Sequence, residues 1–311
     1  MFERFKALEN YSDQEIDRLR NSRVAVIGLG ATGSVIAEHL ARHGVNLLVA
    51  DRDYLEMNDT YSSSIFMPED CEKSLPKAEV VEERLSSIAD VESITDHIGP
   101  ENIDQLKKAD LIIDGTDNME TRMLIDEFSM KKDIPWIYTS ALAESGYSMF
   151  LDEKCFHCMM EDIKIQSLET CETSGILRET ASIAGSLSAK KAVKYLSDQS
   201  VDETLDTVSG ESFSVERTGC TVCEKEDYER LGSSGNAVPV CGENKYQVDH
   251  ETGEEGFERL KQVSDSYSEN DYLVRAEIDD RSIVLFRDGR AIIEARDMGH
   301  AQAIYSEKIG V

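Results

Sequence analysis

Short apolar segments alternate with longer helical patterns through the first half of the chain. The apolar segments resemble strands buried on both faces of a parallel sheet, and they lie at residues 24–27, 47–50, 111–113 and 136–139, with a weaker strand pattern at 92–95. Between them, helices are predicted at residues 33–40, 77–89 and 119–131. This alternation predicts an α/β fold, Rossmann-like, in which helices cover both faces of a mostly parallel sheet.

The pattern changes after Asp152. A helix is predicted at residues 181–196, and the polar, glycine-bearing segment 231–236 has the composition of a linker. Helical and strand patterns then alternate at residues 256–263, 272–278, 283–286, 291–293 and 299–309, with the hairpin signal Asp288-Gly289 between two of the strands. We therefore predict a large domain at residues 1–224 and a small α+β domain at residues 225–311, for which partner docking is the expected role.

A glycine-rich turn joins the first predicted strand to the first predicted helix. Gly28, Gly30 and Gly33 have the spacing that lets backbone approach a phosphate at the N-terminus of a helix. Asp51 follows the second strand, where a carboxylate can accept hydrogen bonds from ribose hydroxyls. The sequence therefore predicts a nucleotide site, and this motif alone leaves the nucleotide open.

Composition narrows the class of protein. The formal net charge of −29 disfavours nucleic acid as a partner, because phosphate neutralisation needs a surface rich in Lys and Arg. No apolar run approaches the roughly 18 residues that indicate a membrane span, and the first residues lack the order of a secretory signal. We therefore expect a cytoplasmic protein without membrane partners, in which cysteines stay reduced.

Two Cys-x-x-Cys pairs follow the glycine-rich turn. They are Cys155 with Cys158, and Cys220 with Cys223. Four thiolates can close the tetrahedral shell of a zinc ion and leave no open position for catalysis. The sequence thus predicts a structural zinc site, in which His157 could replace one thiolate but is not needed.

Two further positions favour transfer of a nucleotidyl group. Lys77 opens a predicted helix, where its charge can stabilise a pentacoordinate phosphorus. Asp117, in Asp114-Gly-Thr-Asp117-Asn118, follows a buried strand, where a carboxylate can hold Mg²⁺ near a triphosphate. Hydride transfer needs neither residue, so together with the cysteine pairs they indicate nucleotidyl transfer.

At this point the sequence resembles the ThiF/MoeB/HesA family, the ubiquitin-activating-type adenylyltransferases. The resemblance covers about residues 1–224 and rests on shared motifs in a shared order: Gly28-Leu-Gly30-Ala31-Thr-Gly33, Asp51-Arg-Asp53, Pro76-Lys77, Asp114-Gly-Thr-Asp117-Asn118, Cys171 ahead of Gly175, and both cysteine pairs. It implies a homodimer that uses Mg²⁺ and ATP to adenylate the C-terminal glycine of a small ubiquitin-like β-grasp protein ending in Gly-Gly, and a structural Zn²⁺.

The resemblance also assigns roles to residues. It implies that Asp51 contacts the ribose, Lys77 the phosphates and Asp117 the magnesium. It further implies cofactor-binding positions at Gly28, Gly30, Ala31, Gly33, Asp53, Asn58 and Asn118. Cys171 matches the position of a thiol that could form a thioester or carry sulfur to the activated carboxylate.

The sequence departs from the family in its arginines. The family usually carries Ser-Asn-Leu-x-Arg-Gln soon after the ribose aspartate, whereas this chain reads Asn58-Asp59-Thr60-Tyr61-Ser62-Ser63. An N-terminal arginine of the family also has no clear match. Loss of both would remove much of a phosphate clamp, and the basic residues considered as replacements are Lys6, Arg18, Arg20 and Arg122.

Two alternatives stay open at this point. An NAD-dependent Rossmann oxidoreductase would explain the glycine-rich turn but not the cysteine pairs. A nucleotide-binding scaffold without catalytic activity would explain the missing arginines. The pathway served also stays open among thiamine, molybdopterin, tRNA thiolation and protein tagging.

Overall fold

The computed structural model describes residues 3–9, 11–160, 175–232, 237–239, 245–248, 252, 254–279, 281–287 and 289–310. The chain divides into two compact units, Met1–Ser233 and Ser234–Val311. The division falls inside the polar segment 231–236. Each unit has a sheet and a hydrophobic core of its own.

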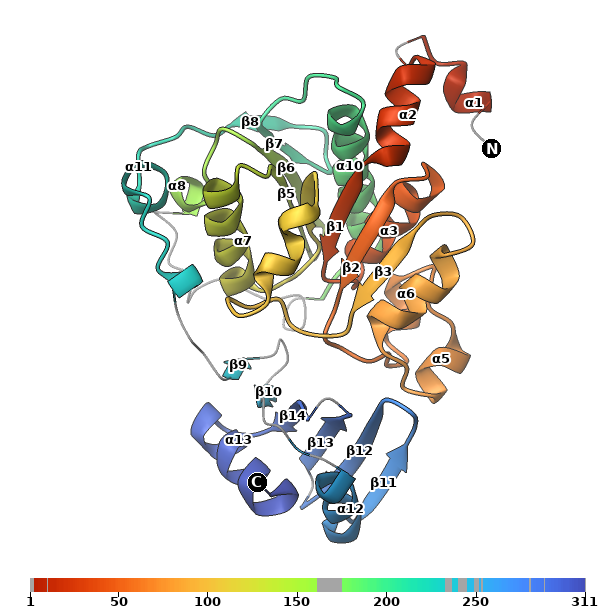
Figure 1. Cartoon of the computed structure of the whole chain (residues 1–311), viewed down its shortest axis with the longest axis vertical. Coiled ribbons are helices and arrows are strands. Elements are labelled where there is room, and N and C mark those ends of the chain that lie inside the picture. Colours follow the sequence, from red (N-terminus) through yellow and green to blue (C-terminus); the bar gives the residue numbers. More distant parts are fainter. Residues whose placement is uncertain are drawn as a thin grey trace. The chain divides into compact units, whose positions relative to one another are not determined.

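The first unit contains an eight-stranded sheet with the order β3-β2-β1-β4-β5-β6-β7-β8 (Figure 1). Its strands are β1 (Arg23–Ile27), β2 (Asn46–Ala50), β3 (Val91–Ile94), β4 (Leu111–Asp114), β5 (Trp136–Leu142), β6 (Ser145–Leu151), β7 (Thr204–Thr207) and β8 (Ser212–Ser214). Pairing is parallel from β3 to β5 and antiparallel from β5 to β8. The predicted mostly parallel α/β sheet is confirmed, and the antiparallel extension was not predicted.

Helices cover both faces of this sheet because alternate strand residues point to opposite sides. Val24 and Val26 belong to one core cluster, which includes residues of α3 (Gly33–Arg42), α6 (Lys77–Leu85) and α10 (Arg178–Leu196). Ala25 and Ile27 belong to the other, which includes residues of η1 (Ile103–Lys108), α7 (Met119–Lys132) and α8 (Phe156–Met160). The continuous apolar runs of the sequence follow from this burial on two faces.

Shorter elements complete the first unit. They are α1 (Glu3–Lys6), α2 (Asp13–Asn21), α4 (Asp59–Ser62), α5 (Pro68–Glu72), α11 (Thr221–Lys225) and η3 (Arg230–Gly232). Helix α2 begins at a capping box, in which the Ser12 hydroxyl accepts from Glu15 N and the Glu15 carboxylate accepts from Ser12 N.

The second unit contains a six-stranded sheet with the order β11-β12-β13-β14-β10-β9, antiparallel throughout. Its elements are β9 (Ala237–Pro239), β10 (Lys245–Val248), α12 (Glu254–Val263), β11 (Ser266–Glu269), β12 (Leu273–Ile278), β13 (Arg281–Phe286), β14 (Ala291–Glu294), α13 (Met298–Ile304) and the helical turn η4 (Tyr305–Ile309). Its buried core includes Phe257, Val274, Leu285 and Tyr305. The unit is therefore a two-layer α+β structure.

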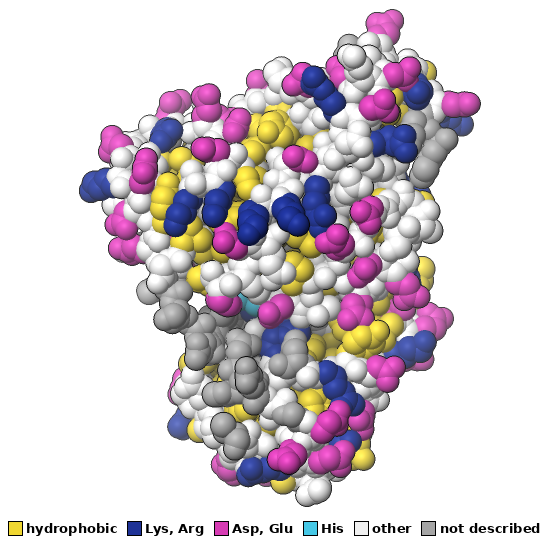
Figure 2. Space-filling view, in the orientation of Figure 1, with side chains coloured by type: hydrophobic (Ala, Val, Ile, Leu, Met, Phe, Trp, Pro, Cys, Tyr) yellow, Lys and Arg dark blue, Asp and Glu magenta, His cyan; other side chains and the backbone are white. Residues whose placement is uncertain are grey.

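The surface reflects the acidic composition. Figure 2 shows Asp and Glu side chains spread over the visible face, with a row of Lys and Arg side chains across it. Four exposed lysines lie at the C-terminal ends of η1 and α7, where positive charge interacts favourably with the helix dipole. They are Lys107 and Lys108 on η1, and Lys131 and Lys132 on α7. Among the described residues, no helix is long and apolar enough to cross a membrane.

Candidate functional site

The glycine-rich turn lies between β1 and α3, at the carboxyl ends of the parallel strands. Gly28 has φ of +80°, and a β-carbon at Gly33 would lie 1.8 Å from the carbonyl oxygen of Gly28. Gly115, after β4, packs its backbone against the same two glycines. By contrast, a β-carbon at Gly30 would meet nothing within 4 Å. Close packing thus explains Gly28 and Gly33, whereas the space beside Gly30 is open to a ligand, next to the half-buried Ala31.

Asp51 connects this turn to the loop after β2. Its Oδ2 accepts from Leu29 N at 2.6 Å, and its Oδ1 accepts from Asp53 N at 2.8 Å. Burial, followed by the charge of Asp53, raises the pKa of Asp51 to about 6, while Lys77 opposes the change. The carboxylate therefore holds two backbone segments of the site together.

Lys77 begins α6 and points back to the same loop. Its backbone N donates to Asp53 O at 2.9 Å, and its Nζ lies 3.0 Å from Asp59 Oδ1 and 3.9 Å from Asp53 Oδ2. Burial alone would lower the pKa of Lys77, but the surrounding carboxylates outweigh it and raise the pKa above its ordinary value. The lysine is therefore a charged, nearly buried group beside the turn.

Asp114 and Arg122 form a buried pair that the sequence reading did not predict. Asp114 accepts from Arg122 Nε at 2.9 Å and from the Thr116 hydroxyl at 2.6 Å. Arg122 also donates to the carbonyls of Thr116 and Thr139 and lies 5.0 Å from the centre of the Tyr138 ring. Arg122 thus joins β4, α7 and β5. Two other basic residues considered as replacements pair elsewhere, Lys6 with Asp13 and Arg18 with Asp198.

The remaining predicted nucleotide contacts lie on loops. Asp117 is exposed just after β4, and the side chain of Asn118 accepts from Thr121 N at 3.1 Å, which caps α7. Asn58 is exposed immediately before α4. These three positions are therefore reachable from solvent or serve as helix caps.

The four predicted metal ligands meet although they lie far apart in the sequence. The Sγ atoms of Cys155 and Cys220 are 3.6 Å apart, those of Cys158 and Cys223 are 3.5 Å apart, and all four lie within 4.8 Å of one another. Zinc–sulfur bonds of about 2.3 Å in a tetrahedron imply sulfur separations of about 3.8 Å. The geometry therefore fits a tetrahedral zinc site.

The ionisation of these thiols differs in the absence of metal. Burial, followed by the charge of Asp126, raises the pKa of Cys155. Burial also acts to raise the pKa of Cys158, but hydrogen bonds from Thr218 and Cys223 outweigh it and lower the pKa to about 6. The cluster thus already favours a thiolate at Cys158.

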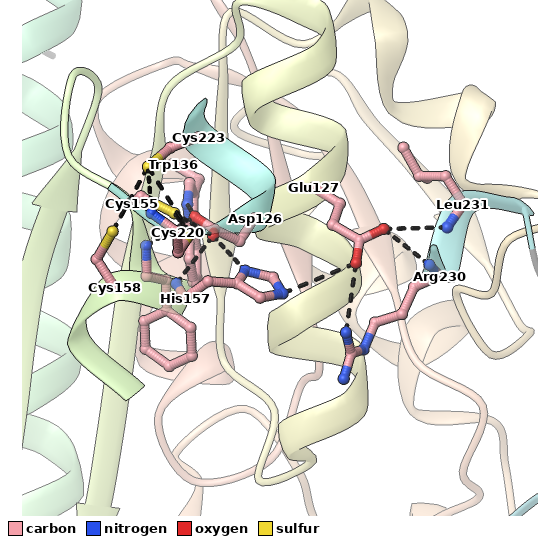
Figure 3. Close-up of polar contacts among 11 residues, drawn as sticks. Asp126, Glu127, Trp136, Cys155, His157, Cys158, Cys220, Cys223, Arg230 and Leu231 are labelled. Atoms are coloured by element: carbon pink, nitrogen blue, oxygen red, sulfur yellow. Dashed lines mark hydrogen bonds and ion pairs between the residues drawn. The ribbon is translucent and has the colours of Figure 1, made fainter. Parts of the chain in front are cut away.

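A carboxylate network adjoins the cysteines (Figure 3). Asp126, fully buried on α7, accepts from Trp136 Nε1 at 3.2 Å, Phe156 N at 3.0 Å, Cys155 Sγ at 3.3 Å, and both the backbone N and Nδ1 of His157 at 3.1 and 2.6 Å. His157 therefore turns its ring toward Asp126. Nothing in the spacing of the sequence indicated this network.

The neighbouring carboxylate extends the network to the end of the first unit. Glu127, also buried, accepts from Arg230 N at 2.9 Å and Leu231 N at 3.2 Å, and its Oε1 lies 3.7 Å from His157 Nε2. Consecutive acids of α7 thus hold the first cysteine pair and the segment that follows the second pair.

Cys171, the predicted acyl or sulfur acceptor, lies outside the described residues. The chain after it is anchored at Ala143, whose N donates to Gly175 O at 2.9 Å and whose O accepts from Leu177 N at 3.0 Å. Ala143 has φ of +50° and Gly175 φ of +70°. Gly175 and Leu177 are therefore attached to the loop between β5 and β6.

Comparisons with known proteins agree with this architecture. The chain is 31% identical to a sulfur carrier protein ThiS adenylyltransferase of Bacillus subtilis over 94% of both chains. It is 30% identical to a protein of the same name from Escherichia coli, over 66% of this chain and 87% of that one. A crystal structure of E. coli MccB with ATP shares the fold, with a TM-score of 0.58 and 18% identity over 68% of this chain and 69% of that one.

These similarities define an enzyme of the adenylyltransferase class. Residues 2–227 match the ThiF family, so the chain belongs to that family. Membership confirms the resemblance seen in the sequence and removes the basis for the NAD-dependent oxidoreductase. The adenylyltransferase names of the relatives favour an enzyme over the non-catalytic scaffold.

Proposed function

We propose that this enzyme uses ATP to adenylate the C-terminal glycine of a small ubiquitin-like sulfur carrier of the β-grasp type. A carboxylate oxygen of the carrier attacks the α-phosphorus, the bond to the bridging oxygen breaks, and pyrophosphate leaves. Related proteins support this choice of substrate by their names, which include a SAMP-activating enzyme E1 of Haloferax volcanii. The product is an acyl-adenylate.

The observation that carries this proposal is the position of Lys77 relative to the glycine-rich turn. A continuous set of hydrogen bonds runs from Leu29 through Asp51 and Asp53 to the backbone of Lys77. A preorganised charge at the reacting phosphorus stabilises the transition state without reorganisation. In this proposal the turn at Gly28, Gly30, Ala31 and Gly33 cradles the phosphates, Asp51 contacts the ribose with Asp53 and Asn58 nearby, and Lys77 stabilises charge at the α-phosphate.

Asp117 would hold a magnesium ion, with Asn118 beside it. Carboxylate and amide oxygens suit this hard cation, and Asp117 is exposed at the carboxyl end of β4, on the strand next to the one that leads into the turn. When bound, Mg²⁺ neutralises phosphate charge. The Cys155, Cys158, Cys220 and Cys223 cluster would hold a structural zinc ion, because its geometry leaves no open coordination position.

Exchange of radiolabelled pyrophosphate into ATP tests the adenylation step. We expect exchange only when a small β-grasp protein ending in Gly-Gly is present. Lys77→Ala should reduce the exchange rate by at least about 100-fold, since electrostatic stabilisers of this kind contribute that much. Lys131→Ala, a change at an exposed lysine, should leave the rate unchanged. Absence of exchange with every cognate carrier would refute the proposed reaction.

A second step at Cys171 is proposed on the family position of this residue. Its thiolate would attack the acyl carbonyl, the bond to AMP would break, and a thioester would form. Trapping the carrier on the enzyme and separating the products without reductant should show a thiol-sensitive adduct. The adduct should persist in Cys71→Ala and disappear in Cys171→Ala, and its persistence in the latter would exclude Cys171.

We also propose that the enzyme is a homodimer and that the second unit docks the carrier. Light scattering should give twice the chain mass of 34.8 kDa. Hydrogen exchange with and without carrier should show new protection in the β12–β14 strands. A monomer in light scattering, or protection confined to the first unit, would refute the respective statement.

A further inference from the structure

The ammonium of Lys77 already has a carboxylate partner. Asp59 lies 3.0 Å from it, and the two side chains are only 17% and 12% exposed. Asp53 is farther away, at 3.9 Å, and also has Arg52 Nε at 3.8 Å from its other oxygen. Asp59 is therefore the carboxylate that engages Lys77 most directly.

Asp59 is held in place independently of Lys77. Its Oδ2 accepts from Glu56 N at 2.9 Å, and its backbone O accepts from Ser63 N at 3.1 Å at the end of α4. The Glu56 carbonyl in turn accepts from Cys71 Sγ at 3.2 Å, which ties this loop to α5. Because the backbone around it is fixed, Asp59 cannot follow the lysine toward a ligand without losing these bonds.

Any phosphate bound at the turn has to share Lys77 with this carboxylate. We propose that Asp59 is a positioning residue that holds the Lys77 ammonium in the nucleotide-free enzyme and competes with the phosphates for it. This inference rests on the proposed function, in which Lys77 binds the phosphates of ATP. Removal of a residue that contacts ATP weakens binding, whereas removal of the Asp59 charge should strengthen it.

Asp59→Asn tests the competition. An asparagine keeps an oxygen that can accept from Glu56 N but removes the charge that attracts Lys77. We expect the dissociation constant for ATP, measured by calorimetry on the full chain, to fall about tenfold. This change corresponds to a small part of the interaction energy of a close ion pair in a partly buried site. Adenosine, which has no phosphates, should bind both proteins equally. Unchanged or weaker ATP binding would overturn the inference.

A matched control exists in Asp70→Asn. Asp70 also accepts from a backbone N, that of Met67, and pairs with a cation, Arg84, at 2.7 Å, but it belongs to α5. This variant removes the same kind of interaction and should leave ATP affinity within about twofold of the wild type. A tenfold gain in Asp70→Asn as well would attribute the effect to general loss of negative charge and overturn the inference.

Direct repulsion between Asp59 and phosphate predicts the same gain, so the pair is tested in a double-mutant cycle. In a Lys77→Met background, the gain from Asp59→Asn should disappear if Asp59 acts through Lys77. A gain that persists there overturns the inference, provided that thermal melts show folded variants. If neither the wild type nor Asp59→Asn binds ATP, the proposed function fails with it, whereas ATP binding without a gain refutes the inference alone.

Discussion

Asp126 should be one of the residues on which the stability of the first unit depends most. Its carboxylate is fully buried and accepts five hydrogen bonds, two at Oδ1 and three at Oδ2. In Asp126→Asn, one oxygen becomes an NH₂ group. A zinc-bound Cys155 would be a thiolate with no proton to donate, so two donors remain at each oxygen. Whichever way the amide turns, two of these donors then face an NH₂ group rather than an acceptor.

The expected cost follows from those unsatisfied donors. A buried donor without an acceptor costs about 1–3 kcal/mol, so two of them give about 2–6 kcal/mol. For a domain of roughly 150–250 residues, 1 kcal/mol corresponds to about 2–4 °C in melting temperature. We therefore expect Asp126→Asn to melt about 4–24 °C below the wild type.

Thermal and urea unfolding with zinc supplied would measure this change. Asp104→Asn is a suitable control, because Asp104 is 66% exposed and its pair with Lys132 at 3.2 Å should contribute less than about 1 kcal/mol. If Asp126→Asn unfolded at the same temperature as this control, the buried network would not contribute the stability that its geometry implies.

Three further predictions follow from the site. Gly33→Ala should unfold or strongly destabilise the chain, because the added carbon meets the Gly28 carbonyl, whereas Gly30→Ala should fold normally and weaken ATP binding; circular dichroism and calorimetry separate the two. The raised pKa of Asp51 means that the folded state binds its proton more tightly, so this residue stabilises the fold less as pH rises from about 4 to about 6. Asp51→Asn should therefore compare more favourably with the wild type at pH 7 than at pH 4 in urea titrations. Cys158→Ser should lower bound zinc, measured by mass spectrometry, and chelation should lower the melting temperature while ATP affinity changes less than twofold.

The sequence predicted the parallel half of the sheet because those strands are buried on both faces and read as continuous apolar runs. The antiparallel strands were harder to recognise. In β8 all three residues are exposed, and in β7 only Thr207 is buried, so neither carries an apolar signature. Their positions follow from pairing with β6, which is a tertiary interaction that local patterns do not contain.

The same contrast between local sequence patterns and tertiary interactions applies to the functional site. Glycine spacing and cysteine pairs are short-range patterns, and they pointed to a turn and a cluster that the structure contains. The partners of charged residues are set by the fold instead. Arg122 forms a buried ion pair with Asp114, which is 8 positions away in the sequence. Glu127 pairs with Arg230, which is 103 positions away. No spacing rule connects residues at such distances along the chain.

Helix α7 runs from the loop that carries Asp117 to the cysteine cluster, and different interactions hold its two ends. Near its N-terminus, the Asn118 cap and the Arg122–Asp114 pair attach it to β4. Farther along, Asp126 attaches it to the first cysteine pair, about 12 Å from Asn118 at the rise of an α-helix, 1.5 Å per residue. Because the Arg122–Asp114 pair is buried and includes no cysteine, loss of zinc can loosen the far end without moving the loop that carries Asp117. The cysteine cluster should therefore govern how stably the enzyme is folded. The loop that carries Asp117 should keep its geometry as long as the chain remains folded.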